Sequence, residues 1–341
     1  MKSATLAFAL TAALAAGTAC AQDVTLRIHH FLPPKGTIQA LVLEPWCEKL
    51  GKESAGRIKC QFFPAMQLGG TPPQLFDQAR DGVADIIWTI PTYQAGRFTK
   101  SEVFELPFMT MSAESGSPAL WDYIQKNSID EFRGVKLLAA HVHDGSLLHF
   151  TSKRVTSLEE VKGLKVRAPT RIGTKFLTAI GAAPVQMPIP QVTEALSKSV
   201  LDGAMVPWEV APALKLQEVA RYHLDTAPGV PKTSNSIFVL AMNPAKYDGM
   251  PADLKKVLDA NAGLEFSKHI GKVFDGTTAP AIRLARDANG VFDTLSPAEY
   301  ARWQKACEPV VTEWIGEAAA KGANGQALYD DARALLKTYG G

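Results

Sequence analysis

The chain has 341 residues, of which 36 are lysine or arginine and 34 are aspartate or glutamate, so its formal net charge at pH 7 is +2. Because the charges nearly cancel and no block of like charge stands out, we expect neither nucleic acid nor an anionic membrane surface as a partner. A chain of this length exceeds what one hydrophobic core usually holds, and we therefore expect two lobes.

Residues 1–21 have the pattern of a signal peptide. A lysine precedes an apolar stretch over residues 4–16 that is too short to span a bilayer, and residues 19–21 read Ala-Cys-Ala, which is a small-residue cleavage site. We therefore expect an exported protein that is cleaved near Ala21. Lipid attachment at Cys20 is the second interpretation, because a glycine stands where lipoprotein signals usually have leucine. No later stretch is long and apolar enough to predict a membrane helix.

Three cysteines follow this segment, at Cys47, Cys60 and Cys307. An oxidising compartment allows a disulfide, and the short loop between Cys47 and Cys60 favours that pair. The alternative is three buried thiols that act as small hydrophobic residues. The sequence leaves this choice open.

Strand and helix patterns alternate through the first half of the chain. We expect strands over residues 24–30, 57–63 and 84–88, and helices over residues 38–53 and 71–81. Thr71 is a capping residue before two prolines, which favour the first turn of a helix. Such alternation indicates parallel strands with helices on both faces of the sheet, and ligands bind at the carboxyl ends of such strands.

A short internal repeat, which we call the internal echo, links the two halves of the chain. Residues 74–88 and 192–205 both read as helix, turn and strand, and aligning Asp85 with Asp202 places Thr89 against Val206. We therefore expect two loops to arise from equivalent strand ends and to face each other across a crevice.

The chain is expected to cross between the lobes twice as a strand. Residues 143–146 join strands over 134–142 and 147–152, and residues 227–231 precede a strand over 236–242. A helical stretch over residues 251–289 is long enough to brace both lobes. Further helices are expected from Pro297 onward and over residues 326–339. We assign residues 22–145 and 228–268 to the first lobe, and residues 146–227 and 269–341 to the second.

Arg167 is the candidate at the centre of the second half. It lies near the end of a short expected strand, residues 165–168, that stops at Pro169 because proline cannot extend a sheet ladder. The strand end is where a small anion would bind. The alternative is a surface arginine or one half of a structural ion pair.

The surroundings of Arg167 resemble a known family. The matching segments are residues 62–64, 67–70, 82–85, 105–108, 158–169, 181–188, 191–196 and 201–203. In their order and spacing they resemble DctP-type solute-binding proteins of tripartite ATP-independent periplasmic (TRAP) transporters, and they cover most of the mature chain.

This resemblance implies a fold, a partner and a role for one residue. It implies the α/β, two-lobed periplasmic binding protein fold, with two open mixed sheets flanked by helices and joined by hinge strands and a long helix. The protein would bind an organic carboxylate in the periplasm and deliver it to the membrane permease of a TRAP transporter. Arg167 matches the family arginine that pairs with the substrate carboxylate. No cofactor, metal or enzymatic activity is expected, and we expect a monomer.

Two departures from the family pattern bear on the ligand. Sialic-acid and dicarboxylate binders of the family often carry a second arginine on the strand that here spans residues 145–150, and an asparagine after the Asp-Gly pair. In this chain, leucines stand where the second arginine would be, and His149 is the nearest polar residue. Val206 stands where the asparagine would be. We therefore expect a monocarboxylate with an apolar or aromatic body. A C4-dicarboxylate or a 2-oxo acid is the alternative.

The expected pocket combines both lobes. The candidate substrate-binding residues are Arg167, Trp208, His149, Phe31, Thr89, Tyr93, Val206 and Asn235. Trp208 has an alternative role as a packing residue, and His149 and Asn235 have structural roles as alternatives. Trp88, in the middle of a strand, is more typical of the core.

Other chemistry has weaker signals. His141 and His143 share one face of a strand next to Asp144, but no further zinc motif accompanies them. A cation that assists substrate binding is a remaining alternative. No catalytic motif is recognisable, and lone carboxylates such as Glu194 and Glu209 have no evident partner. An exported hydrolase and a ligand receptor for a membrane sensor are the other functions considered.

Overall fold

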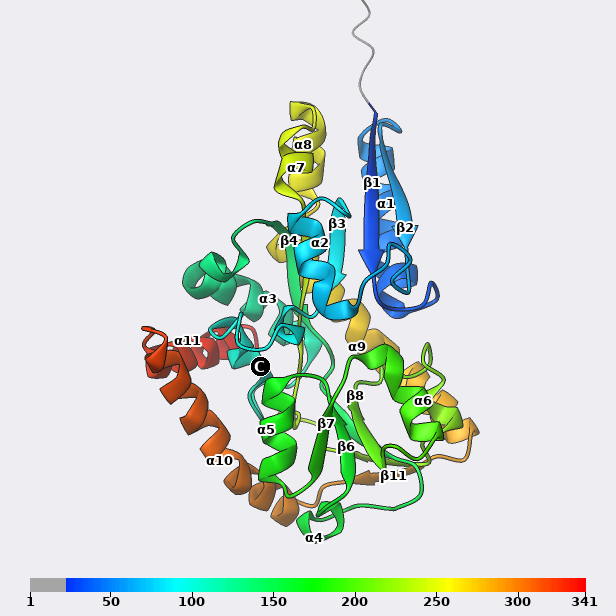
Figure 1. Cartoon of the computed structure of the whole chain (residues 1–341), viewed down its shortest axis with the longest axis vertical. Helices are drawn as coiled ribbons and strands as arrows, with labels where there is room; N and C mark the ends of the chain where they lie inside the picture. Colours follow the sequence, from blue (N-terminus) through cyan, green and yellow to red (C-terminus); the bar gives the residue numbers. More distant parts are fainter. Residues whose placement is uncertain (1–22) are drawn as a thin grey trace, which may run out of the picture.

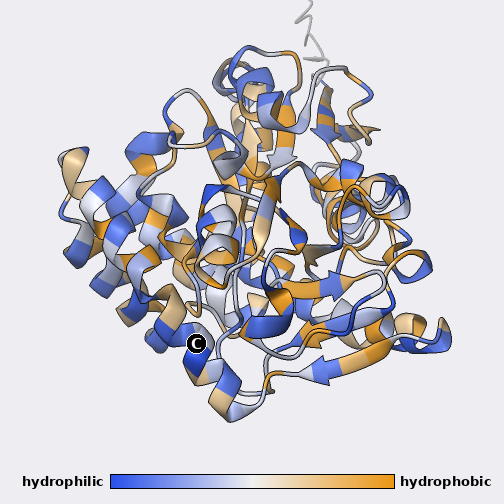
Figure 2. Ribbon diagram, turned by 60° about the horizontal axis from the view of Figure 1, so that its bottom comes forward, coloured by the Kyte–Doolittle hydropathy of each residue, from blue (hydrophilic) through white to orange (hydrophobic). Residues whose placement is uncertain are grey.

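The computed structural model describes residues 23–341, so the expected signal peptide and Cys20 lie outside the described residues. Two sheets, each flanked by helices, form an upper and a lower lobe in Figure 1. Hydrophobic residues concentrate on the strands, whereas many outward-facing helix positions are hydrophilic (Figure 2). This arrangement confirms the fold class expected from the sequence.

The first sheet has five strands in the order β2-β1-β3-β10-β4. They are β1 (Val24–His30), β2 (Ile58–Phe63), β3 (Ile86–Thr89), β4 (Lys136–Val142) and β10 (Ile237–Met242). β1 pairs in parallel with β2 and β3, and β10 runs antiparallel to β3 and β4. Every residue of β3 and β10 is buried, which explains their continuous apolar sequences.

The second sheet has six strands in the order β11-β9-β5-β8-β6-β7. They are β5 (Leu147–Phe150), β6 (Lys165–Ala168), β7 (Ala183–Gln186), β8 (Gly203–Val206), β9 (Tyr222–Asp225) and β11 (Val291–Thr294). β6 pairs in parallel with β7 and β8, whereas β5 is antiparallel to β8 and β9. Pro184 is tolerated in β7 because that strand is at the edge of the sheet.

Helices cover the sheets and connect their strands. They are α1 (Glu44–Glu53), α2 (Leu75–Arg80), α3 (Ala113–Tyr123), α4 (Leu158–Val161), α5 (Arg171–Ala179), α6 (Val192–Ser197), α7 (Pro244–Asp248), α8 (Ala252–Ala260), α9 (Leu264–Asp287), α10 (Pro297–Ala320) and α11 (Gly325–Thr338). The helical stretch expected over residues 251–289 is divided into α8 and α9. Gly263 lies in the break, where its φ of 82° is a conformation that favours glycine. Within residues 23–341, no helix is long and apolar enough to cross a membrane.

The internal echo is confirmed by hydrogen bonding. In the first sheet the Asp85 N–H donates to the Arg27 carbonyl, and the Arg27 N–H donates to the Asp85 carboxylate. Asp202 and Lys165 repeat both bonds in the second sheet. The strand trio β2-β1-β3 therefore corresponds to β7-β6-β8, and Arg167 occupies the position that His29 holds in the first lobe.

Four connections join the lobes: two strand crossings and the helices α9 and α10. Residues 143–146 link β4 to β5 and residues 226–236 link β9 to β10, with a bridge between Ser146 and Ser234 where these crossings lie side by side. The third connection is α9, which packs against α3 at its start and leads into β11 (Figure 1). Its 24 residues span about 36 Å at about 1.5 Å per residue.

The expected lobe boundaries need one correction, at the carboxyl terminus. α10 begins beside the second sheet, and its Trp314 indole donates to the Thr99 carbonyl of the first lobe at 3.0 Å. α11 then packs on α3, and the Tyr339 hydroxyl donates to Asp122 at 2.5 Å. The long α10 thus returns the chain to the first lobe, so α11 does not belong to the second lobe as expected.

The cysteine question is settled by the fold. Cys47 of α1 and Cys60 of β2 form a disulfide, with an S–S distance of 2.06 Å. This confirms the pair that the short loop favoured and attaches α1 to the edge strand of the first sheet. Cys307 is a buried thiol on α10.

Candidate ligand-binding site

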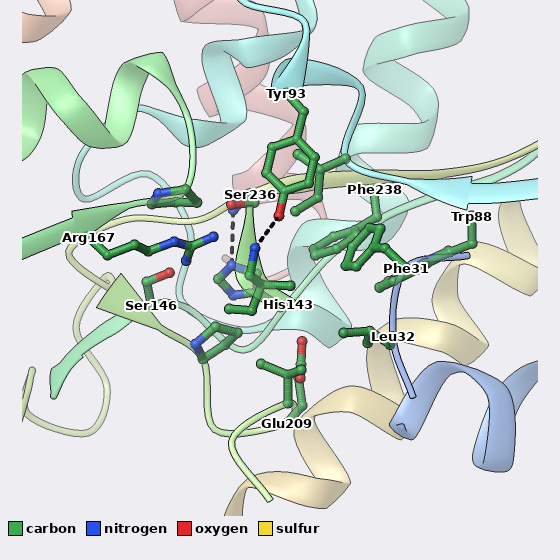
Figure 3. Close-up of a pocket in the computed structure, with 15 residues that line it drawn as sticks. Phe31, Leu32, Trp88, Tyr93, His143, Ser146, Arg167, Glu209, Ser236 and Phe238 are labelled. Carbon is green, nitrogen blue, oxygen red and sulfur yellow. Dashed lines mark hydrogen bonds between the residues drawn. The ribbon is translucent and has the colours of Figure 1, made fainter. Parts of the chain in front are cut away.

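A cavity lies where the strand ends of the two lobes meet, and about 340 Å³ of it is unfilled by protein atoms. Its wall from the first lobe contains Phe31, Leu32, Trp88, Ile90, Tyr93 and Phe238. Its wall from the second lobe contains Arg167, Pro169, Ile189, Pro207, Glu209 and Val210. His143, Ser146 and Ser236 of the two crossings complete it (Figure 3).

Arg167 carries a charge into this cavity. It is 1% exposed, because β6 is covered on both faces before it ends at Pro169. Nε donates to the Met187 carbonyl at 2.9 Å and Nη1 donates to the Met205 carbonyl at 2.7 Å. Nη2 has no hydrogen-bond partner among the described residues. The position therefore rules out a surface arginine, and the pairing rules out a structural ion pair within residues 23–341.

Tyr93 places a hydroxyl beside the guanidinium. The hydroxyl accepts a hydrogen bond from the Ile189 N–H at 3.3 Å, which connects the two lobes across the cavity. Burial raises the pKa of Tyr93, although the nearby Arg167 opposes the shift. The phenol therefore keeps its proton and is able to donate it in a hydrogen bond to an anion.

His143 is held neutral at the floor of the cavity. The N–H groups of Gly145 and Ser236 point at its two ring nitrogens, at 2.9 Å and 3.1 Å. A protonated imidazole would have no lone pair to receive either of them. Burial, with smaller contributions from His141 and Arg167, lowers the pKa of His143 to about 3.

The first lobe supplies an aromatic wall. The ring of Phe31 lies 4.9 Å from the ring of Trp88, which in turn stacks on Phe238 at 4.7 Å. The Trp88 indole N–H donates to His141 at 2.8 Å, and this bond holds the indole in place. Flat rings arranged in this way make a surface that matches an aromatic ligand.

Glu209 is a second buried ionisable group of the lining. It is 5% exposed, and its Oε2 atom has no hydrogen-bond partner within residues 23–341. Burial raises its pKa well above the usual range, and the neighbouring Asp144 raises it further. Burial therefore disfavours the charged form of this side chain.

Comparison with known proteins identifies the family. The model of bacterial extracellular solute-binding protein family 7, DctP, matches residues 28–317. The chain belongs to this family. The resemblance drawn from the sequence motifs is thereby confirmed, and members of family 7 bind substrates for transport.

Solved structures of TRAP solute-binding proteins match this family 7 chain closely. One, from Rhodoferax ferrireducens T118, contains copurified benzoate; it is 42% identical, with 93% of this chain and 98% of that chain covered and a TM-score of 0.91. One from an unidentified marine microbe is described as specific for aromatic acid ligands and contains 3-hydroxybenzoate; it is also 42% identical, with coverages of 93% and 99% and a TM-score of 0.91. A Bordetella bronchiseptica protein with bound mandelate is 27% identical, with coverages of 92% and 99% and a TM-score of 0.84.

Arg167, Phe31 and Tyr93 line the cavity of this family 7 protein, as the sequence predicted them to do. Thr89 does not, because its side chain faces the other side of β3, where its hydroxyl is 3.5 Å from the Pro72 carbonyl. Its neighbours Trp88 and Ile90 line the cavity instead. Side chains alternate along a strand, so a shift by one residue selects the opposite face.

The same shift explains the placement of Val206 and Trp208. Both are buried but lie outside the cavity lining, whereas Pro207 and Glu209 face the cavity. Trp208 packs in an aromatic cluster of the second lobe, 4.9 Å from His149. These are packing contacts, and the expected contact of Trp208 with a substrate stays a prediction.

His149 and Asn235 also lie outside the lining, and both form hydrogen bonds within the protein. His149 donates from Nε2 to the Val206 carbonyl at 3.1 Å, and its Nδ1 lies 2.8 Å from Nδ1 of His223. The Asn235 amide donates to the Thr110 hydroxyl at 2.7 Å and to the His143 carbonyl at 3.0 Å. Asn235 thus supports a cavity residue from behind.

The zinc interpretation of His141 and His143 has no geometric support. His141 uses both ring nitrogens, because Nδ1 donates to the Val142 carbonyl at 3.0 Å while Nε2 accepts from Trp88. In the part of the chain that the structure describes, no group of three or more His, Cys, Asp or Glu side chains is placed to hold a metal ion.

Sequence reasoning missed three important lining residues, namely His143, Glu209 and Ser236. Glu209 had a usable signal, because a lone carboxylate next to a strand end has no evident partner. His143 and Ser236 had none, since the crossings that carry them meet only in the folded protein.

Proposed function

We propose that this family 7 protein binds an aromatic monocarboxylate in the periplasm and delivers it to the membrane permease of a TRAP transporter. The observation that carries the proposal is the buried Arg167 guanidinium, whose Nη2 faces a cavity with aromatic walls and has no partner in residues 23–341. A buried charge without a counter-ion is costly, and a ligand carboxylate would remove that cost.

The charge of the cavity favours one carboxylate rather than two. Arg167 is the cation among the described lining residues, because the pKa of His143 is lowered to about 3, and burial of Glu209 disfavours its charged form by raising its pKa. A bound monocarboxylate would neutralise the site. A second carboxylate would have no cation to pair with and would remain buried, which disfavours a C4-dicarboxylate. A small 2-oxo acid would leave the aromatic wall without contact.

The relatives support the same ligand class. The two TRAP proteins at 42% identity are described with benzoate and 3-hydroxybenzoate, and the Bordetella bronchiseptica protein is described with mandelate. Each of these ligands joins one carboxylate to one aromatic ring.

Binding is proposed to close the two lobes around the acid. Three hydrogen bonds cross between them beside the cavity: Tyr93 with Ile189, Thr37 with Glu209, and Thr170 with Glu105. A ligand that contacts both walls would favour this arrangement over an open one.

The remaining features of the proposal follow from the family and the sequence. TRAP solute-binding proteins are periplasmic, and we propose that this chain is exported, cleaved near Ala21 and monomeric. Transport would be its function rather than catalysis. Presentation of the loaded form to a membrane sensor, and hydrolysis of an ester or amide, are the alternative functions that experiment has to separate.

The test is a calorimetric titration of the mature protein with benzoate. Arg167→Ala should lower affinity by roughly 30-fold to several-thousand-fold, corresponding to about 2 to 5 kcal/mol for loss of one partner of a buried charge pair. Lys165→Ala, on the same strand but exposed, is the matched control and should bind like the parent. Equal affinity of the parent and Arg167→Ala would exclude the proposed site.

A further inference from the structure

Glu209 is held rigidly at the edge of the cavity. It follows β8 after Pro207, and its backbone carbonyl accepts a hydrogen bond from the Thr37 hydroxyl of the other lobe at 2.7 Å. Figure 3 shows its carboxyl group directed into the cavity, on a different side from Arg167 and from the aromatic wall. A ligand held by Arg167 would therefore present another part of itself to Glu209.

No structural role accounts for this carboxyl group. It forms no ion pair with the lysines and arginines of residues 23–341, and Oε2 lacks a hydrogen-bond partner there. Buried polar atoms of native proteins nearly always have a partner, and an unmet one calls for an explanation. Since the atom lies in the lining of a ligand cavity, the ligand is the partner that the fold leaves room for.

The protonation state restricts the chemistry of that partner. The ionisable groups near Glu209 are Asp144, whose own pKa burial raises to about 7, and Arg167 across the cavity. A neutral carboxyl group donates one hydrogen bond and accepts others. A hydroxyl group matches this pattern without bringing a further charge into the cavity, whereas a second carboxylate or an ammonium group would add one.

We propose that Glu209 is a specificity-determining residue that binds a hydroxyl group on the ring of the aromatic acid, while Arg167 binds the carboxylate. This inference rests on the proposed function. The ligand class it names is a hydroxylated aromatic monocarboxylate. A site built to pair with a hydroxyl discriminates against the analogue without it, because the buried polar group is then left unpaired.

The experiment measures dissociation constants for benzoate and for 2-, 3- and 4-hydroxybenzoate with the parent, Glu209→Gln and Glu209→Leu. In the parent, one isomer should bind roughly tenfold tighter than benzoate. Glu209→Leu should bring the ratio of the dissociation constants of benzoate and the preferred isomer close to one. Glu209→Gln should keep most of the preference, because an amide also donates and accepts. A preference that persists in Glu209→Leu, or the absence of any preference in the parent, would overturn the inference.

Controls separate this inference from the proposed function. Glu194→Gln removes an exposed carboxylate of the same lobe that pairs with Lys198, and it should leave the ratio unchanged. Circular dichroism establishes folding, and Glu209→Gln is nearly isosteric should Glu209→Leu fail to fold. If neither benzoate nor any hydroxybenzoate isomer binds the parent, the proposed function and this inference both fail. If benzoate binds through Arg167 but the ratio of dissociation constants is the same in the parent and the Glu209 variants, this inference alone fails.

Discussion

Arg167 brings a permanent charge into a cavity whose other ionisable groups are kept uncharged. Burial lowers the pKa of His143 and raises the pKa values of Tyr93 and Glu209, so it disfavours the charged form of each of these groups. The effect is an isolated positive charge with neutral hydrogen-bonding groups around it. Such a site selects ligands by net charge first and by the placement of hydroxyl groups second.

Behind the aromatic wall, His141 makes stability sensitive to acid. Burial lowers its pKa from 6.5 to about 3, and the neutral ring accepts the Trp88 indole N–H. The unfolded chain therefore binds this proton more readily below about pH 6.5, so folding stability falls as pH falls toward 3. Between pH 7 and pH 5.5, His141 alone should remove about 1 kcal/mol of the free energy of unfolding.

Chemical denaturation at several pH values checks this prediction. His141→Gln preserves an acceptor for Trp88 but does not titrate, so its stability should fall less between pH 7 and pH 5.5 than that of the parent. Other buried histidines titrate in both proteins and cancel in the difference. Identical pH slopes for the two proteins would contradict the assignment.

At the scale of elements, the two lobes repeat one strand and helix unit. β1 and β3 of the first lobe correspond to β6 and β8 of the second, with Asp85 and Asp202 in matching hydrogen bonds. Corresponding strand ends then meet across the cavity, which places Ile90 and Pro207 on opposite walls. The sequence echo was sufficient to find these strand ends but did not determine which face of each strand points inward.

The packing of α9 against α3 depends on close backbone approach at Gly271. A Cβ atom there would lie 2.2 Å from the Ala113 carbonyl oxygen and 2.7 Å from the Ser117 hydroxyl. Gly271→Ala should therefore lower the free energy of unfolding by about 1 to 3 kcal/mol, measured by urea denaturation.

Gly276 of the same helix is the matched control. A Cβ atom at this exposed position meets nothing within 4 Å, so Gly276→Ala should raise the free energy of unfolding by about 0.5 to 1 kcal/mol through helix propensity. Opposite signs for the two substitutions are expected. Equal effects would show that α9 does not depend on contact with α3 at Gly271.

For the whole molecule, the central question is how the two lobes are held together around the cavity. The Thr37 hydroxyl of the first lobe donates to the Glu209 carbonyl of the second at 2.7 Å, although Thr37 itself is outside the lining. We expect a bond of this kind to form in the closed arrangement and to be lost in an open one. It should then add to ligand affinity by favouring the proposed closure.

Thr37→Val should lower benzoate affinity by about 3- to 10-fold, the effect of one lost hydrogen bond. Calorimetry gives the affinity, and small-angle scattering should show a smaller decrease in radius of gyration on benzoate addition than in the parent at the same ligand concentration. Thr178→Val is the control. Thr178 is an exposed residue of α5, and its hydroxyl donates a hydrogen bond to the Thr174 carbonyl of the same helix. Unchanged affinity in Thr37→Val would argue against this contact as a closure element.

Patterns in the sequence predicted the class of fold and the position of Arg167, and they favoured the Cys47–Cys60 pair without excluding free thiols. These depend on local patterns: alternating strands and helices, a short loop between Cys47 and Cys60, and a strand that stops at Pro169. The family resemblance added a role for the arginine. Such signals can be read from the sequence because each arises from residues that are neighbours along the chain.

Only the tertiary structure decided which side chains surround the ligand. Thr89 and Trp208 have side chains of suitable chemistry, but the direction of each strand end turned them away and turned Trp88 and Glu209 inward. A change of one residue reverses the face, and the packing of helices behind each sheet selects it. Glu209 acquires its neutral state in the same way, because burial between two lobes raises its pKa and no local sequence pattern encodes that burial.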